Sequence, residues 1–148
     1  MKFTLKYFQE LSVDELYLFL QLRSEIFCVE QNCVYQDLDN KDQKALHLMG
    51  YDDSDKLVAY ARILVPGVSY KEASIGRVVL SASLRGKGAG KELMQAAIDA
   101  SIKKLNVNEI VISGQQYLEK FYNDLGFVTE SEPYEEDHIL HIKMRLRK

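Results

Sequence analysis

The sequence contains only two cysteines, no long apolar run and little net charge. Without a run of about 18 apolar residues there is no candidate transmembrane helix. Residues 1–16 break their apolar positions with charges, so they offer no signal-peptide core. Nineteen Lys and Arg against 22 Asp and Glu leave a net charge of −3, which provides no long-range attraction to nucleic acid or to an anionic membrane. We therefore expect a soluble, cytoplasmic protein with neither nucleic acid nor membrane among its partners.

The two cysteines, Cys28 and Cys33, are expected to be reduced thiols, because disulfides are uncommon in chains without a secretion signal. A zinc site would need two further ligands, and the nearest histidine, His47, lies beyond an acidic loop without ligand spacing. The loop at 32–44 carries three aspartates but lacks the glycine and the final glutamate of an EF-hand. We expect no metal site.

What the chain does contain is typical of one folded domain spanning residues 1–148, with 47% apolar and 28% charged residues. Alternation and helical spacing predict an α/β fold, a mixed sheet covered by helices. The predicted strands are 3–8, 46–51, 57–65, 74–81, 109–113 and 138–146, with another from Phe127 onward; the predicted helices are 12–28, 89–104 and 116–125.

Arg23 falls on the apolar stripe of the first helix, where a charge is unexpected. Either the side chain extends to water or caps the helix, or it is a buried charge with a carboxylate partner. We favour the first interpretation.

The most informative segment is a glycine-rich turn between a buried strand and the longest helix, at residues 85–90. Free amides at a helix start, with the helix dipole behind them, form a receptor for phosphate. Arg85, Lys87 and Lys91 add positive charge there. The alternative is an ordinary flexible surface turn. The spacing fits neither the P-loop, because Gly90-Lys91 is followed by Glu92, nor the dinucleotide fingerprint, because the glycines are spaced G-x-G-x-G.

Arg85-x-x-Gly88-x-Gly90, between a strand and a helix, resembles the coenzyme A loop of the GNAT N-acetyltransferase superfamily. A second segment, Phe121 to Phe127, resembles the FYxxLGF element of the same superfamily. Further residues resemble its ElaA-like branch: Leu22-Arg23, Ile26 to Gln31, Tyr35, Asp37, Asp39, Asp42, His47-Leu48, Glu135 to Asp137 and His141-Ile142. The resemblance covers almost the whole chain. One departure is that His138 and Leu140 stand where the branch more often has glycine and proline.

The resemblance implies a mixed, mostly antiparallel sheet with helices on both faces and an acetyl-CoA co-substrate. Backbone groups of Val78, Val79 and Leu80 would bind the pantetheine arm, together with Gln115. Tyr122 would protonate the departing thiolate, because a phenol with a pKa of about 10 keeps its proton at neutral pH; its alternative role is packing. The pyrophosphate would lie beside Arg85 on the amides of Gly86, Lys87, Gly88, Ala89, Gly90 and Lys91.

The acceptor would be a small-molecule or peptide amine that attacks the thioester directly, after a base removes its proton. The candidate acceptor-side residues are Glu30, Asp39, His47 and His141, and a water chain is an equal alternative as the base. Because Glu30, Asp37, Asp39 and Asp42 gather in or beside one loop, we expect an acidic entrance that favours cations, unless these carboxylates only solvate the loop.

Three classes of function compete. The first is an acetyl-CoA-dependent N-acetyltransferase, the second a coenzyme A or acyl-CoA sensor without turnover, and the third an interaction domain without coenzyme. The intact glycine turn argues against the third, and Tyr122 favours the first over the second. A homodimer is a further possibility.

Overall fold

A single sheet of eight strands runs through the chain, whose 148 residues are all described by this computed structural model. The strand order is β1-β2-β3-β4-β5-β8-β6, and β7 pairs with β8. Only β4 and β5 are parallel, so the predicted mixed, mostly antiparallel sheet is confirmed. The strands are β1 (Lys2–Tyr7), β2 (Ala45–Tyr51), β3 (Leu57–Leu64), β4 (Ala73–Leu80), β5 (Glu109–Gln115), β6 (Val128–Thr129), β7 (Tyr134–Glu136) and β8 (Ile139–Arg147).

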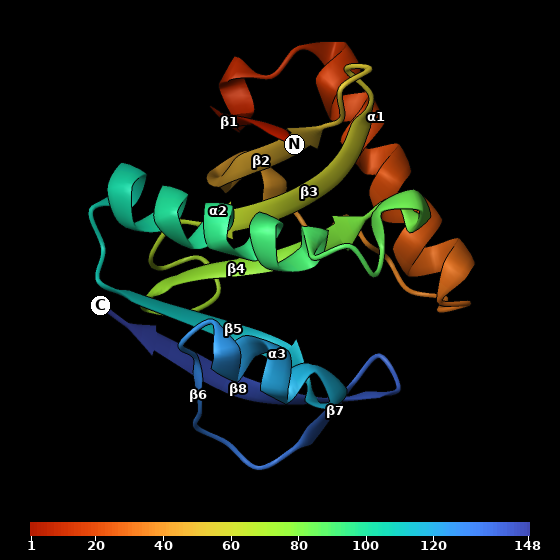
Figure 1. Cartoon of the computed structure of the whole chain (residues 1–148). Coiled ribbons are helices and arrows are strands. Elements are labelled where there is room, and N and C mark those ends of the chain that lie inside the picture. The colour runs from red at the N-terminus through yellow and green to blue at the C-terminus, as the bar shows by residue number, and fades with distance from the viewer.

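Helices cover both faces of the sheet, as β3 shows by its alternation. Ala59, Ala61 and Ile63 pack in the core beneath α2 (Ala89–Leu105), whereas Tyr60 packs in a second cluster with Phe19 of α1 (Val13–Arg23). Successive residues of a strand point to opposite faces, so α1 and α2 lie on opposite sides. The short α3 (Glu119–Asp124) lies beside β5 and β8 on the α2 side (Figure 1).

A capping box begins α1. The Ser12 hydroxyl accepts from the Glu15 amide at 3.0 Å, and the Glu15 carboxylate accepts from the Ser12 amide at 2.8 Å. After Arg23 the helix continues as a π-helical segment, Ser24–Glu30, so the prediction that it reaches Cys28 was right in extent but missed the change of hydrogen-bond register. Wider π turns often occur at functional sites.

The sheet opens between β4 and β5. These strands pair only at Ala73 with Ile110 and Ser74 with Val111, and their carboxyl ends then diverge (Figure 1). On its other edge, β4 carries a bulge opposite β3: Arg62 pairs with Gly76 and Tyr60 with Val79, so two β4 residues face one on β3. Arg77, in this bulge, has a φ of 51°. Bulges bend and twist a strand, which helps β4 to turn away from β5.

The last two strands form a hairpin with a two-residue turn. Glu136 pairs with Ile139, and the residues between them, Asp137 and His138, have φ values of 49° and 66°. Positive φ at both central positions is typical of a type I′ turn, which usually contains Asn or Gly. This geometry explains why glycine would suit the position that His138 occupies.

Candidate active site

A cavity of about 780 Å³ lies where β4 and β5 diverge. Its wall is formed by β3, β4, β5, the π-helical segment, the start of α2, α3 and the β7–β8 hairpin. Of the residues expected at the site, the lining includes Glu30, Asp39, Val78, Val79, Leu80, Arg85, Gly90, Gln115, Tyr122 and His141. It does not include Gly86, Lys87, Gly88, Ala89, Lys91 or His47.

The glycine turn leaves a run of backbone amides without partners. The N-cap of α2 is Gly88, with a φ of 76°, and no side chain caps the helix. None of the amides of residues 86–91 donates to an acceptor within the chain; the first bond of the helix runs from Glu92 to the Gly88 carbonyl. Because the turn lies between Arg85 and Gly90, which do line the cavity, these amides and the exposed Lys87 and Lys91 fit an anionic group at its rim.

Tyr122 lies against β5 within this cavity. Its ring packs edge to face on Phe121 and Phe127, with centroids 5.2 and 6.0 Å away. Its hydroxyl forms no hydrogen bond within the chain. Burial raises the pKa of Tyr122 to about 12, and Tyr117 acts in the same direction, so the hydroxyl keeps its proton over the physiological range.

Gly114 makes this placement of Tyr122 possible. A Cβ at Gly114 would lie 2.9 Å from Cε2 of the ring, closer than carbon atoms approach. Gly114 is not among the predicted site residues because it follows the predicted strand 109–113. An isolated glycine at the end of an apolar strand was the available signal.

Three arginines and three aspartates form a cluster of ion pairs beside the cavity, and Asp39, Arg62 and Arg77 of this cluster line it. Its members are Arg23, Arg62, Arg77, Asp37, Asp39 and Asp42. Arg23 has no exposed surface; its Nε donates to Asp37 and its Nη1 to Asp42, both at 2.8 Å. The favoured interpretation of Arg23 as a snorkelling or capping residue was therefore wrong, and the alternative of a buried charge with carboxylate partners is correct.

The other two arginines complete the pairing. Arg62 donates to both Asp39 oxygens at 2.8 Å and to Asp42 at 3.0 Å, while Arg77 donates to Asp37 at 2.7 Å and to Asp39 at 3.3 Å. Although partial burial opposes the shift, the bonds from Arg62 lower the pKa of Asp39 to about 2.

The prediction of an acidic entrance is wrong, because each of the four carboxylates expected there forms an ion pair with an arginine. Asp37, Asp39 and Asp42 belong to the cluster, and Glu30 forms an ion pair with Arg85 at the glycine turn. The sequence shows that these aspartates are close together, but no local pattern links them to the arginines of α1, β3 and β4 that the fold brings to them.

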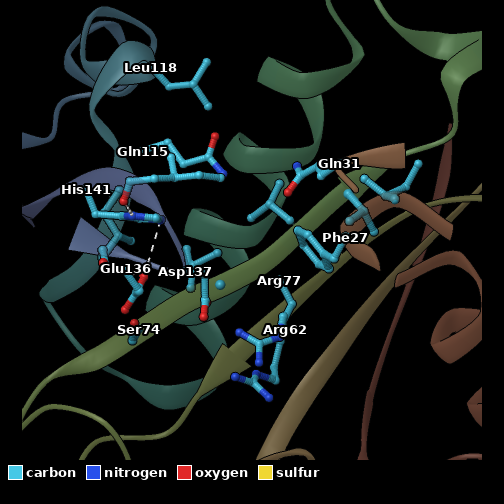
Figure 2. A pocket seen from close by; sticks show the side chains of 18 of the residues that line it. Phe27, Gln31, Arg62, Ser74, Arg77, Gln115, Leu118, Glu136, Asp137 and His141 are labelled. Atoms are coloured by element: carbon cyan, nitrogen blue, oxygen red, sulfur yellow. Dashed lines mark hydrogen bonds and ion pairs between the residues drawn. The ribbon is translucent and has the colours of Figure 1, made fainter. Parts of the chain in front are cut away.

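The two candidate histidines lie in different surroundings. His47 has no exposed surface; its Nε2 donates to the Asp42 carbonyl at 2.8 Å, and Nδ1 accepts from the Tyr60 hydroxyl at 2.6 Å. Both nitrogens are used and neither reaches the cavity. His141 does line the cavity, where its Nε2 is 3.3 Å from Oε2 of Glu136 (Figure 2).

No group of three or more His, Cys, Asp or Glu side chains is arranged to hold a metal ion. Cys28 and Cys33 are free thiols. No helix has both the length and the apolar character needed to cross a bilayer.

Comparison with known proteins gives one consistent result. Residues 20–148 match the Acetyltransferase (GNAT) domain family. Protein ElaA of Escherichia coli is 42% identical over 137 residues, which are 91% of this chain and 89% of that protein. A crystal structure of Escherichia coli ElaA covers 99% of this chain and 100% of its own, with a TM-score of 0.91. A crystal structure of an acyl-CoA N-acyltransferase from Pseudomonas aeruginosa is 39% identical, covers 99% of each chain and has a TM-score of 0.91. The chain therefore belongs to the GNAT acetyltransferase family, in its ElaA-like branch, with an N-acyltransferase fold and an acyl-CoA as the family's co-substrate.

Proposed function

We propose that the chain transfers an acetyl group from acetyl-CoA to the primary amine of a small molecule or peptide. The observation that carries this proposal is the continuity of the site. One cavity extends from Arg85 and Gly90 at the glycine turn, along the unpaired edge of β4, to Gln115 and Tyr122. That path joins an anion receptor to a proton donor.

The residues for holding acetyl-CoA follow from this path. The amides of residues 86–91 would bind the pyrophosphate, and the α2 dipole would add to their attraction. From Ile75 onward β4 has no partner on β5, so backbone groups of Val78, Val79 and Leu80 on that edge would bind the pantetheine amides, with Gln115 opposite them. When bound there, the coenzyme supplies a thioester whose carbonyl carbon accepts the amine.

Tyr122 would assist departure of the thiolate. With a pKa of about 12 against about 8.5 for a thiol, its proton is held too tightly for a complete transfer to be favourable alone. The tyrosine would therefore act by donating a hydrogen bond to the developing thiolate, passing its proton on only as a replacement arrives.

The test combines coenzyme binding with turnover. Acetyl-CoA should raise the melting temperature in a concentration-dependent way, because a ligand that binds only the folded state stabilises it. Thiol release should then appear with at least one amine in a panel of polyamines, amino acids, aminoglycosides and peptides. No thermal shift at millimolar acetyl-CoA would contradict the coenzyme site. A shift without thiol release from any amine would favour the alternative function, an acyl-CoA-binding or sensor domain.

Gly90→Asp and Gly90→Ala are matched variants for the coenzyme site. A Cβ at Gly90 would meet Leu80 and Phe121 at ordinary contact distances, 3.6 and 3.8 Å, so both variants should fold. The aspartate places a negative charge beside the free amides and should abolish the thermal shift, whereas the alanine should retain most of it. Equal shifts for both would contradict the glycine-turn assignment.

A cytoplasmic location and a homodimer stay predictions.

A further inference from the structure

Glu136 and His141 meet at the cavity wall because a two-residue turn pairs β7 with β8. The His141 side chain is almost fully buried, and its ring stacks on Tyr134, with centroids 6.3 Å apart. The Ser113 hydroxyl is 2.5 Å from the Tyr134 hydroxyl and 3.4 Å from Oε2 of Glu136. Ser113 of β5 and Tyr134 of β7 therefore hold Glu136 and His141 in position.

The hydrogen bonds of His141 determine where its proton lies. Nδ1 is 2.8 Å from the carbonyl oxygen of Ile139, which can only accept, so Nδ1 carries a hydrogen. In the neutral ring Nε2 then has a lone pair, and it faces a carboxylate oxygen 3.3 Å away. Such a pair holds one proton: either Nε2 is protonated and donates to Glu136, or an external donor bonds to both groups.

We propose that Glu136 and His141 form the receptor for the acceptor's primary ammonium, and that Nε2 of His141 is the base that removes its first proton. This inference rests on the proposed function. A primary ammonium has three N–H donors, so it can bond to Glu136 and to Nε2 of His141 together. Arg62, Arg77 and Asp137 line the same cavity as this pair (Figure 2), and the rest of the acceptor would occupy that cavity.

The step balances in protons and bonds. His141 takes one proton from the ammonium and later releases it to solvent. The neutral amine forms the new C–N bond with the thioester carbon, and the C–S bond breaks. Tyr122 gives its proton to the thiolate and regains one from the nitrogen that has become an amide. The products are an N-acyl amine, a free thiol and one proton.

The other candidate bases are less suited by their contacts. Both nitrogens of His47 are bonded inside the core, Asp39 is bound by two arginines, and Glu30 is paired with Arg85. Glu136 and Tyr134 of β7 are the titratable groups in contact with His141, while Asp137 of the turn and Tyr70, which interacts with Tyr134 and Glu136, line the same cavity. The strand on its other side, β5, brings Gln115 and Ser113, which do not titrate.

The hairpin supplies a matched control. Glu135 and His138 form a second Glu–His pair, 3.5 Å apart, whose side chains are 67% and 94% exposed. Neither lines the cavity. The variants to compare are Glu136→Gln and His141→Asn against Glu135→Gln and His138→Asn. Asparagine at position 141 keeps a donor for the Ile139 carbonyl but has no counterpart of Nε2.

His141→Asn should lower kcat at neutral pH by about a hundred- to ten-thousandfold, the usual range for general base catalysis, while the thermal shift by acetyl-CoA is unchanged. Above neutral pH its rate should keep rising toward the amine's own pKa, because solution then supplies neutral amine. Glu136→Gln should mainly raise KM, by about ten- to a hundredfold, through loss of a charge-assisted bond. Both control variants should match wild type.

Nitrogen NMR on histidine-labelled protein gives a readout without turnover, since the chain has only three histidines. We expect neutral His141 in the Nδ1–H form and His47 in the Nε2–H form, and we expect n-butylammonium, the probe, to shift the Nε2 signal of His141 in wild type but not in Glu136→Gln. Wild-type transfer with an equal single-turnover rate in His141→Asn would overturn this inference and leave the proposed function intact. An Nε2–H form of neutral His141, or an unmoved signal, would overturn it as well. Acetyl-CoA binding without transfer to any amine by wild type would contradict the proposed function itself.

Discussion

Two walls of one cavity carry most of the charged groups of the site, and they differ in how those groups are bonded. On one wall, Asp39, Arg62 and Arg77 line the cavity. They belong to a cluster in which three aspartates bind three arginines from α1, β3 and β4, and the charges cancel. On the other wall, His141 and Glu136 face each other with no arginine or lysine bound to either. The Arg–Asp cluster stabilises the fold, because its charged groups are bonded to one another. The Glu136–His141 pair can bind a ligand, because it has acceptor atoms without a bound cation.

The first wall has an evident structural role. Asp37 joins Arg23 of α1 to Arg77 in the β4 bulge, and Asp42 joins Arg23 to Arg62 of β3. Positive φ at a non-glycine residue persists where surrounding contacts hold it, and Arg77 is held by the Asp37 carboxylate and carbonyl at 2.7 and 2.8 Å. The cluster thus fixes the bulge that helps β4 turn away from β5.

The largest expected effect comes from removing one carboxylate of the cluster. Asp42→Asn takes away the charge that binds both Arg23 and Arg62, and a buried ion pair that loses one partner costs about 3–5 kcal/mol of folding free energy. The same carboxylate-to-amide change at Glu136, whose side chain is half exposed, should cost within about 0.5 kcal/mol. Urea unfolding of both variants measures the difference, and equal losses would mean that the two walls are not distinct.

The order of strands and helices could be predicted from the sequence because it depends on local patterns. Sequence patterns located seven of the eight strands to within a few residues, and the start of α1 lies one residue from its predicted position. The short β7 was not predicted as a separate strand. The limits of the last helix were less accurate: residues 116–118 form a 3₁₀ turn, and only Glu119–Asp124 is α-helical.

The pairings of the acceptor side could not be predicted in the same way. Arg62 and Asp39 are 23 residues apart, and Arg77 and Asp37 are 40 apart, so no spacing rule links them. For Glu136 the sequence provided only a family resemblance. Its contact with His141 depends on a type I′ turn formed by Asp137 and His138, and this turn contains no glycine that would have predicted it. Long-range pairing is a property of the folded sheet and leaves little trace in local sequence.

Tyr122→Phe tests whether the cavity's proton donor is chemical or structural. The ring contacts with Phe121 and Phe127 and the approach to Gly114 stay, so stability and acetyl-CoA affinity should be nearly unchanged. The single-turnover rate of acetyl transfer should fall by about ten- to a thousandfold. Equal fall of kcat and kcat/KM would indicate an interaction made in the transition state, whereas a wild-type rate would make Tyr122 a packing residue.

Protonation of His47 at acid pH should lower the stability of the protein around the Arg–Asp cluster. Burial lowers the pKa of His47 below its usual value of 6.5, and the charges of Arg23 and Arg62 lower it further, although Asp42 acts in the opposite direction. The unfolded chain therefore binds more protons as pH falls below about 6.5, and stability declines by at most about 1.4 kcal/mol per pH unit for this one group. Aspartates whose pKa values are lowered act only below about 4.

Urea unfolding between pH 4.5 and 7.5 measures this decline. His47→Gln should be less stable at pH 7.5 but should lose less stability on acidification, whereas His138→Asn, with its exposed ring, should follow wild type. An unchanged slope in His47→Gln would show that another group is responsible for the acid sensitivity.

The smallest effect is expected from salt. An acidic entrance would steer cationic amines and speed their association by at least about tenfold, and this gain would disappear as the screening length falls from about 30 Å at 0.01 M to about 3 Å at 1 M. Because Glu30, Asp37, Asp39 and Asp42 are each paired with arginine, we expect kcat/KM for a cationic amine to change by less than about tenfold over that range. Asp39→Asn should then lower stability and leave the cluster with one net positive charge, so kcat/KM for a cationic amine should not fall with added salt. A steep fall of kcat/KM with salt that Asp39→Asn removes would mean that this carboxylate is free in solution, and the difference between the two walls would then be one of position alone.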